Sequence, residues 1–136
     1  MTCEQLAEIH RACFRVPRPW SADEFAGLLA GPHCFLVPHA SGFALGRAVA
    51  GEAELLTIAV LPDTRRTGLG KQLLAGFLAE AQTRQATSAF LEVAADNDAA
   101  IRLYEGQGFA LAGRRKGYYA TSSGAVDALI YSRALV

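Results

Sequence analysis

A short stretch rich in glycine and positive charge, DTRRTGLGKQLLAGFL at residues 63–78, is suited to bind an anion. Gly68 and Gly70 stand directly before apolar residues with helical spacing. Glycine lets the backbone turn sharply and approach a ligand, and the N–H groups and dipole at a helix start attract oxygen-rich anions. A plain glycine-rich turn with solvated arginines explains this segment equally well. Three cationic side chains accompany the glycines: Arg65, Arg66 and Lys71.

Two familiar phosphate-binding motifs do not fit this stretch. A P-loop requires G-x-x-x-x-G-K-[ST], but Arg65 stands in place of its first glycine and Gln72 in place of Ser or Thr. The dinucleotide motif G-x-G-x-x-G fails because Leu73 occupies its third glycine position. The pattern that remains is R-x-x-G-x-G between an expected strand and an expected helix.

Glu92 and Tyr104 are of residue types that serve in acid–base chemistry. From the residues alone, the carboxylate in FLEV is more simply explained as facing solvent at a sheet edge. Tyr104 stands at i+3 from Ile101, so it also fits an ordinary helix core with a satisfied hydroxyl. Asn97 fits a helix N-cap, a position that asparagine favours.

Composition indicates one cytoplasmic globular domain spanning residues 1–136. Apolar residues make up 51% and charged residues 19%, while 13 Lys and Arg balance 13 Asp and Glu. This balance argues against nucleic acid or an anionic membrane as a partner. The N-terminus MTCEQLAEIH lacks the basic and apolar regions of a signal peptide, and no apolar run approaches the ~20 residues of a membrane span.

The cysteines and histidines show no catalytic or metal-binding pattern. The three cysteines are an odd number without a C-x-x-C pair. His10 and Cys13 stand one helical turn apart, and His33 is adjacent to Cys34, but no third ligand recurs at metal-site spacing. We therefore expect these residues to be structural and expect no metal.

Helices and strands are expected to alternate around one mixed sheet, which makes the fold class α/β or α+β. RVPRP should end the first helix, and RRKGYY at residues 114–119 is equally compatible with a solvated basic turn and with the rim of a substrate site. PHASG should form the first hairpin turn. Helices are expected over 3–14, 22–29, 69–84 and within 96–109, where the helix should end at a glycine. Strands are expected over 34–37, 43–50, 53–60, 89–95 and 125–135.

Local signals strengthen two of the expected helices. Ser21 and Glu24 form a capping box, and Trp20 and Phe25 form a hydrophobic staple around it. Gly76 inside the longest helix costs about 1 kcal/mol against alanine, so it indicates a close packing contact. That helix carries one apolar stripe: Leu69, Leu73, Leu74, Phe77, Leu78 and Ala81.

The segment LLTIAVLPDTRRTGLGKQLL resembles motif A of the GNAT (GCN5-related) N-acetyltransferases. The resemblance implies a GNAT fold, with a central, mostly antiparallel sheet, a splayed strand pair and flanking helices. It also implies that the loop binds the pyrophosphate of acetyl-CoA and that strand backbone binds its pantetheine arm. The implied cofactor-binding residues are Ile58, Ala59, Val60, Arg65, Arg66, Thr67, Gly68, Leu69, Gly70, Lys71, Asn97 and Tyr104.

The remaining sequence is similar to the RimI-like branch, the ribosomal-protein-alanine N-acetyltransferases. The similar segments are RPWS, FLEVAADNDAAIRLYEGQGF, GRRKGYY and DALIYSRAL, so the resemblance runs from about residue 4 to the end. It implies that Glu92 is the base, acting directly or through water, and that Tyr104 protonates the leaving thiolate. Backbone N–H groups near Val60 would stabilise the oxyanion.

The resemblance implies transfer of acetyl to a protein N-terminus, specifically an N-terminal alanine of a small-subunit ribosomal protein. The alternatives are the same fold acting on a small amine, such as a polyamine, amino acid or aminoglycoside, and a non-catalytic coenzyme A-binding domain. One departure from the family is that its first strand is missing or reduced to residues 1–3. An unpaired sheet edge would remain, and we expect another chain to cover it. The expected state in solution is a monomer or a weak homodimer.

Overall fold

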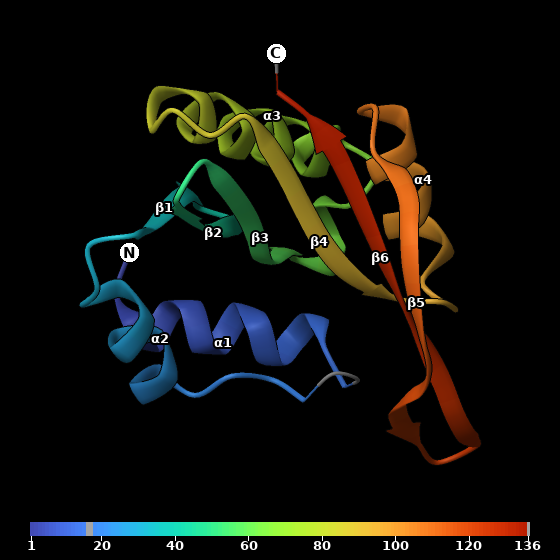
Figure 1. Ribbon diagram of the computed structural model, residues 1–136. Coiled ribbons are helices and arrows are strands. Elements are labelled where there is room, and N and C mark those ends of the chain that lie inside the picture. Colours follow the sequence, from blue (N-terminus) through green and yellow to red (C-terminus); the bar gives the residue numbers. More distant parts are fainter. Residues whose placement is uncertain (16–17, 136) are drawn as a thin grey trace.

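The structure is a computed structural model that describes residues 1–15 and 18–135. Within these residues the chain forms one α/β domain with a six-stranded sheet flanked by helices (Figure 1). The elements in chain order are α1 (Cys3–Cys13), α2 (Ala22–Leu29), β1 (Cys34–His39), β2 (Gly42–Val49), β3 (Glu52–Val60), a 3-10 turn η1 (Pro62–Thr64), α3 (Leu69–Thr83), β4 (Ser88–Ala94), α4 (Asp98–Gly106), β5 (Ala110–Thr121) and β6 (Gly124–Ala134).

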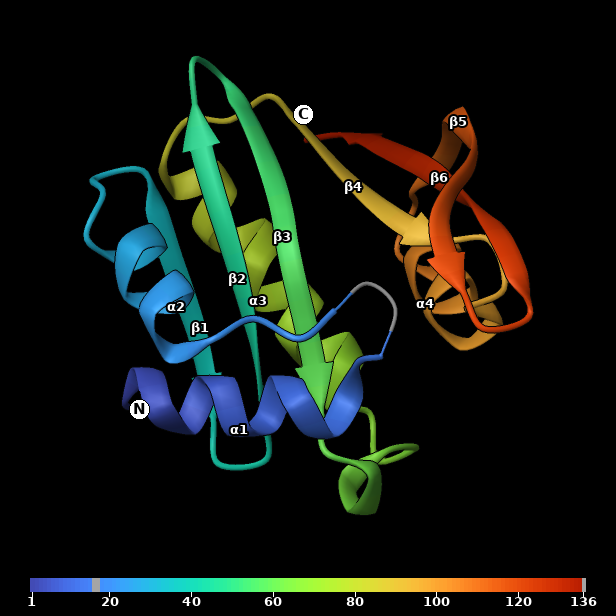
Figure 2. The ribbon, with the colours of Figure 1, turned by 90° about the horizontal axis from the view of Figure 1, so that it is seen from below.

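The sheet has the order β1-β2-β3-β4-β6-β5, and only the β3–β4 pair is parallel. The mixed, mostly antiparallel sheet is therefore confirmed. β3 and β4 are paired from Glu52↔Ser88 to Leu55↔Leu91, after which both strands continue without pairing to each other. Figure 2 shows them diverging toward their C-terminal ends, which confirms the splayed pair.

A β-bulge lies where the two strands separate. Gly46 pairs with Leu55 and Leu45 pairs with Thr57, so Leu56 is an extra residue on β3. A bulge re-aims the side chains that follow it. Leu55 accordingly packs into the core under α3, while Thr57 is buried on the opposite side against α1.

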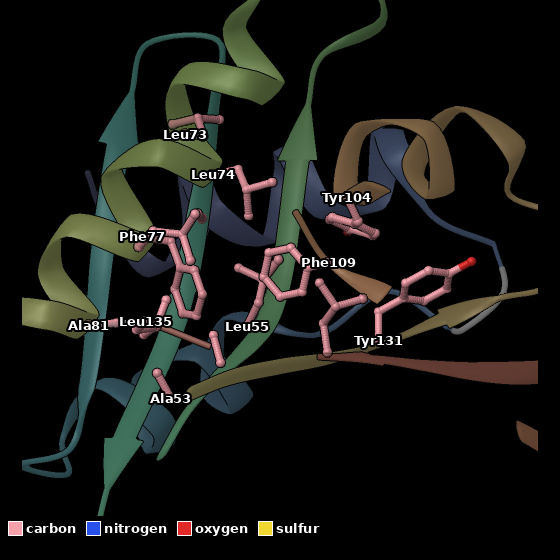
Figure 3. Packing of buried hydrophobic residues seen from close by; sticks show 14 of the residues in the cluster. Ala53, Leu55, Leu73, Leu74, Phe77, Ala81, Tyr104, Phe109, Tyr131 and Leu135 are labelled. Carbon is pink, nitrogen blue, oxygen red and sulfur yellow. The ribbon is translucent and has the colours of Figure 1, made fainter. Parts of the chain in front are cut away.

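The helices cover the two faces of the sheet in pairs, with α1 and α2 on one side and α3 and α4 on the other (Figures 1 and 2). The six apolar residues expected to form the stripe of α3 are all buried. Figure 3 shows Leu74 and Phe77 of this helix facing Leu55 of β3, with Tyr104 and Phe109 continuing the core. A second core lies under α1 and α2 and includes Phe25 and Phe43.

The helix starts predicted near the N-terminus are confirmed. Ser21 and Glu24 form both bonds of a capping box, and the rings of Trp20 and Phe25 lie 5.5 Å apart between centroids. The expected break at residues 15–19 falls partly on residues 16–17, which lie outside the described residues.

The sheet begins at β1, with no strand before it in the described part of the chain. Thr2 already caps α1, so residues 1–2 form no strand. β1 is therefore an outer strand of the sheet in the described residues. That another chain covers this edge stays a prediction.

β5 was not anticipated, and the interpretation of residues 114–119 as a basic turn is wrong. These residues lie inside β5, an edge strand that pairs with β6 and extends beyond the body of the domain as a hairpin (Figure 1). Most of β5 is exposed, and two register shifts interrupt its pairing. Alternation of apolar and polar residues, the usual sign of a strand, is therefore absent. In the first hairpin, β1 also includes Pro38 and His39, which were expected in the turn.

Replacing either of two helical glycines by alanine is expected to change stability, in opposite directions at the two positions. A Cβ on Gly76 would lie 2.8 Å from Cγ1 of Val37, whereas a Cβ on Gly27 of α2 would meet nothing within 4 Å. Gly27→Ala should therefore stabilise the fold by about 0.5–1 kcal/mol. Gly76→Ala should destabilise it by about 1 kcal/mol, because valine is stiff and overpacking outweighs the gain in helix propensity. Urea unfolding of both variants is the measurement, and stabilisation by Gly76→Ala would contradict the packing argument.

Candidate active site

Two adjoining cavities occupy the region where β3 and β4 separate. The larger, here called the loop cavity, has a volume of about 520 Å³, and the smaller splay cavity has about 110 Å³. The loop cavity is lined by Cys13, Phe14, Ile58, Ala59, Val60, Arg65, Arg66, Gly70, Asn97, Ala99, Ala100, Leu103 and Tyr104. The splay cavity is lined by His10, Phe14, Trp20, Leu55, Leu56, Thr57, Ile58, Leu91, Glu92, Val93, Ala94, Asn97, Ala100, Tyr104 and Tyr119.

The start of α3 provides the expected anion-binding geometry. Gly68 is the N-cap with φ +86°, a left-handed conformation that glycine adopts without strain, and no side chain caps the helix among the described residues. The positive end of the α3 dipole is therefore left for a ligand. Arg65, Arg66 and Gly70 line the loop cavity beside it. This arrangement fits an oxygen-rich anion such as a pyrophosphate.

The end of β3 is fixed by two hydrogen bonds to one carbonyl. Arg65 Nε donates to the Val60 carbonyl oxygen at 3.1 Å, and Cys13 Sγ donates to the same oxygen at 3.2 Å. Arg65 thus ties the loop to the strand in addition to facing the cavity. Cys13 has the structural bond expected of it, although its position on the cavity wall was not anticipated.

The predicted cofactor-binding residues divide into two groups. Most of them line the loop cavity, but Thr67, Gly68 and Lys71 are exposed and do not belong to its lining. The side chain of Leu69 is buried in the core, so only its backbone can serve a ligand. The residues that line the loop cavity are Ile58, Ala59, Val60, Arg65, Arg66, Gly70, Asn97 and Tyr104.

Glu92 does not lie on an outer strand of the sheet. Its strand, β4, lies between β3 and β6, and the side chain is 26% exposed in the splay cavity. Tyr119 Oη donates a hydrogen bond to Glu92 Oε1 at 3.0 Å, and Arg115 Nε lies 3.6 Å from Oε2. The alternative of a solvated carboxylate at an edge is therefore wrong. Sequence reasoning missed both partners because it assigned no strand to their segment.

A bulge in β5 aims Tyr119 at Glu92. The residues between Arg115 and Tyr119 leave the ladder, and Gly117 adopts φ +60°. Asp127 of β6 holds this bulge, because its Oδ1 accepts the Gly117 N–H at 2.8 Å and its Oδ2 accepts Arg114 Nη1 at 2.7 Å. These two hydrogen bonds lower the pKa of Asp127. One half-buried aspartate thus positions the donor to Glu92.

Tyr104 lies at the junction of the two cavities. It is 5% exposed on α4, its ring packs edge-on against Phe109 with centroids 6.1 Å apart, and it lines both cavities. Burial raises the pKa of its hydroxyl, so the proton is held at neutral pH. Tyr104 is thus part of the core and also reaches the cavities. Asn97 is confirmed as the N-cap of α4, accepting the Ala100 N–H at 3.3 Å.

A buried polar pair closes the splay cavity on the α1 side. Nε2 of His10 lies 3.0 Å from Oγ1 of Thr57, and Nδ1 of His10 accepts the Trp20 backbone N–H at 3.0 Å. The imidazole is stacked between the rings of Phe14 and Trp20. Burial lowers the pKa of His10 to about 4, against a smaller opposing effect of Glu24. The histidine is therefore neutral at physiological pH.

Two other kinds of site do not occur in the described part of the chain. Across residues 1–15 and 18–135, no three or more His, Cys, Asp or Glu side chains gather as they would around a metal ion. No helix within these ranges combines the length and apolar character needed to cross a membrane.

The sequence model of the acetyltransferase (GNAT) family matches residues 3–109. The splayed β3–β4 pair, the glycine loop before α3 and all the lining residues of the two cavities except Tyr119 lie inside this range. The chain therefore belongs to the acetyltransferase (GNAT) family.

Within this family the chain is similar to enzymes named as N-acetyltransferases, some of them named for a ribosomal protein substrate. It is 42% identical over 116 residues to the ribosomal protein bS18-alanine N-acetyltransferase of Salmonella typhimurium, covering 82% of this chain and 78% of the relative. It is 35% identical to the N-alpha-acetyltransferase RimI of Mycobacterium tuberculosis, covering 88% and 79%. The crystal structure of the ribosomal-protein-S18-alanine N-acetyltransferase from Escherichia coli superposes with a TM-score of 0.88 at 35% identity, covering 98% and 87%.

His10 makes stability depend on pH. Its pKa falls from 6.5 to about 4 on folding, so between these values the unfolded chain binds a proton that the folded chain does not. Above pH 6.5 the neutral imidazole makes its full contribution to the free energy of unfolding. As the pH falls from 6.5 toward 4 this contribution is lost, by up to about 1.4 kcal/mol per pH unit. Urea unfolding at several pH values should show this slope in the wild type and a reduced slope in His10→Gln. Identical slopes would contradict the assignment.

Proposed function

We propose that the chain is an acetyl-CoA-dependent N-α-acetyltransferase that acts on a protein N-terminus, most specifically an N-terminal alanine of a small-subunit ribosomal protein. The observation that carries the proposal is the junction of the two cavities. Glu92 and Tyr104 both face the splay cavity, and Tyr104 also faces the loop cavity with its arginines and uncapped helix start. Family membership and the names of the similar enzymes support the same activity.

The loop cavity would hold acetyl-CoA. Its volume of about 520 Å³, the uncapped N-terminus of α3 and the side chains of Arg65 and Arg66 fit a long ligand with a pyrophosphate. The co-substrate supplies a thioester at the junction of the cavities. Asn97 and Tyr104 lie at that junction and would contact its acetyl end. Backbone N–H groups at the end of β3 near Val60 would stabilise the oxyanion.

The chemistry requires only modest assistance from the protein. A free α-amine has a pKa of about 7.7–8.0, so a single carboxylate near neutral pH suffices to remove its proton. Glu92, oriented by Tyr119, would accept this proton directly or through water. The Tyr104 hydroxyl, which burial keeps protonated, would donate to the leaving sulfur. The amine attacks the thioester directly, and no covalent enzyme intermediate forms.

The size of the splay cavity supports a small N-terminal residue. Its volume of about 110 Å³ is bounded by the large side chains of Phe14, Trp20 and Leu56. The α-amine and methyl group of alanine suit an enclosure of this kind. We propose a cytoplasmic location and a monomer or weak homodimer, in line with a ribosomal protein substrate.

The first test is incubation of the purified protein with acetyl-CoA and an alanine-starting peptide from the host's ribosomal protein. Thiol release and the mass of the peptide are followed together. We expect one acetyl group on the α-amine, and little transfer to polyamines, amino acids or aminoglycosides. Transfer to small amines alone would reject the ribosomal substrate, and binding of acetyl-CoA without any transfer would favour the non-catalytic alternative.

The catalytic roles are tested by two conservative substitutions. Tyr104→Phe should lower kcat by about 100-fold, since it removes the acid. Glu92→Gln should lower kcat/KM by about 10–100-fold at pH 7 and recover part of the loss above pH 8, where the amine is neutral without a base. Glu8→Gln, which changes an exposed carboxylate on α1 outside both cavities, is the control. Unchanged turnover in both conservative variants would reject the mechanism.

A further inference from the structure

His10 and Thr57 are the buried polar side chains of the described core, and they bond to each other. They come from α1 and β3, and the bond joins the helix to the strand immediately after its bulge. A buried polar pair requires desolvation of both groups, which an apolar pair of the same shape avoids. Both residues line the splay cavity, so their polar atoms also affect which ligands that cavity can bind.

The donors and acceptors in the two hydrogen bonds of His10 can be assigned. The Trp20 backbone N–H can only donate, so Nδ1 of His10 is an acceptor and the proton of the neutral ring lies on Nε2. Nε2 therefore donates to Oγ1 of Thr57. A threonine hydroxyl has one proton of its own, and that proton is not used by His10. The result is a hydroxyl that is fixed in place and has a donor left for the cavity.

Two other polar side chains of the splay cavity are already engaged with each other. The Tyr119 hydroxyl donates to Glu92, and Glu92 as a carboxylate only accepts. Asn97 and Tyr104 lie at the junction with the loop cavity, where the thioester would be. On the side of the cavity near Trp20, away from this junction, the Thr57 hydroxyl and the Trp20 indole N–H are the side-chain donors available among the described residues, and His10 fixes the position of the first.

We propose that Thr57, oriented by His10, donates a hydrogen bond to the main-chain carbonyl oxygen of the acceptor's first residue. This inference rests on the proposed function. An α-amine of a peptide carries that carbonyl one carbon away, whereas a polyamine or a lysine side chain does not. Thr57 is thereby a specificity-determining residue for aminoacyl acceptors, and His10 is a positioning residue that acts through it.

The test compares two peptides that differ in one atom. The first is the alanine-starting peptide, and the second carries sulfur in place of the first carbonyl oxygen, which makes that group a much poorer hydrogen-bond acceptor. In the wild type we expect kcat/KM to be about 5–10-fold higher for the oxygen peptide, the effect of one hydrogen bond. In Thr57→Val this ratio should fall to about 1, and Thr57→Ser should restore it. The KM for acetyl-CoA should not change.

The role of His10 is tested with the same ratio. His10→Gln can place an amide N–H where Nε2 lies, so it should keep most of the preference, whereas His10→Leu should lose it. In the Thr57→Val background, His10→Leu should have no further effect on the ratio. A general loss of stability lowers both rates together and leaves the ratio unchanged, and thermal unfolding of each variant monitors it directly.

Two results overturn the inference while the proposed function stands. One is a wild type that acetylates both peptides equally well, and the other is a preference that survives in Thr57→Val. Absence of transfer from the wild type to either peptide would instead reject the proposed function and the inference with it.

Discussion

The loss of pairing between β3 and β4 is the constraint on which the rest of the structure depends. Parallel strands that stay paired would leave no room for a ligand, and the backbone groups of Leu56 to Val60 would be used in the ladder. The bulge at Leu56 ends the ladder at Leu55 and turns Thr57 toward α1. The open strands then require other partners. The Val60 carbonyl obtains them from Cys13 and Arg65, and side chains from α1, α4 and β5 wall the remaining space.

The two faces of the sheet consequently hold two halves of the site. On the α3 and α4 face, a left-handed glycine and an uncapped helix start favour an anion, and the apolar stripe of α3 holds that helix start against the core. On the α1 and α2 face, the stacked rings around His10 form a small apolar enclosure with one polar pair inside it. Tyr104 lies where the halves meet. The chemistry that we propose needs this separation, because a polar co-substrate and a small amine must approach one point from opposite sides.

The sequence predicted the parts whose signals are local. Ser21 with Glu24, the apolar stripe of α3 and the spacing of Arg65, Gly68 and Gly70 each lie within a few turns of chain, so pattern and capping chemistry indicate them directly. Contacts between distant segments left no such signal. Thr57 lies 47 residues from His10, and Tyr119 lies 27 from Glu92. The second contact was further hidden because β5 is exposed along most of its length and twice bulged, which removes the alternation that predicts a strand.

The two edges of the sheet differ in what they contribute. The edge at β1 is two strands away from β3, and the lining residues of both cavities include none from β1 or β2. The open edge at β1 therefore contributes no lining residue to the site. The edge at β5 has the opposite character, since it supplies Tyr119 and Arg115 to Glu92 through a bulge that Asp127 holds. A strand that carries a bulge for this purpose cannot also be a regular, buried strand. The bulge that brings the Tyr119 hydroxyl to Glu92 is thus also the reason why β5 lacks the sequence pattern of a regular strand.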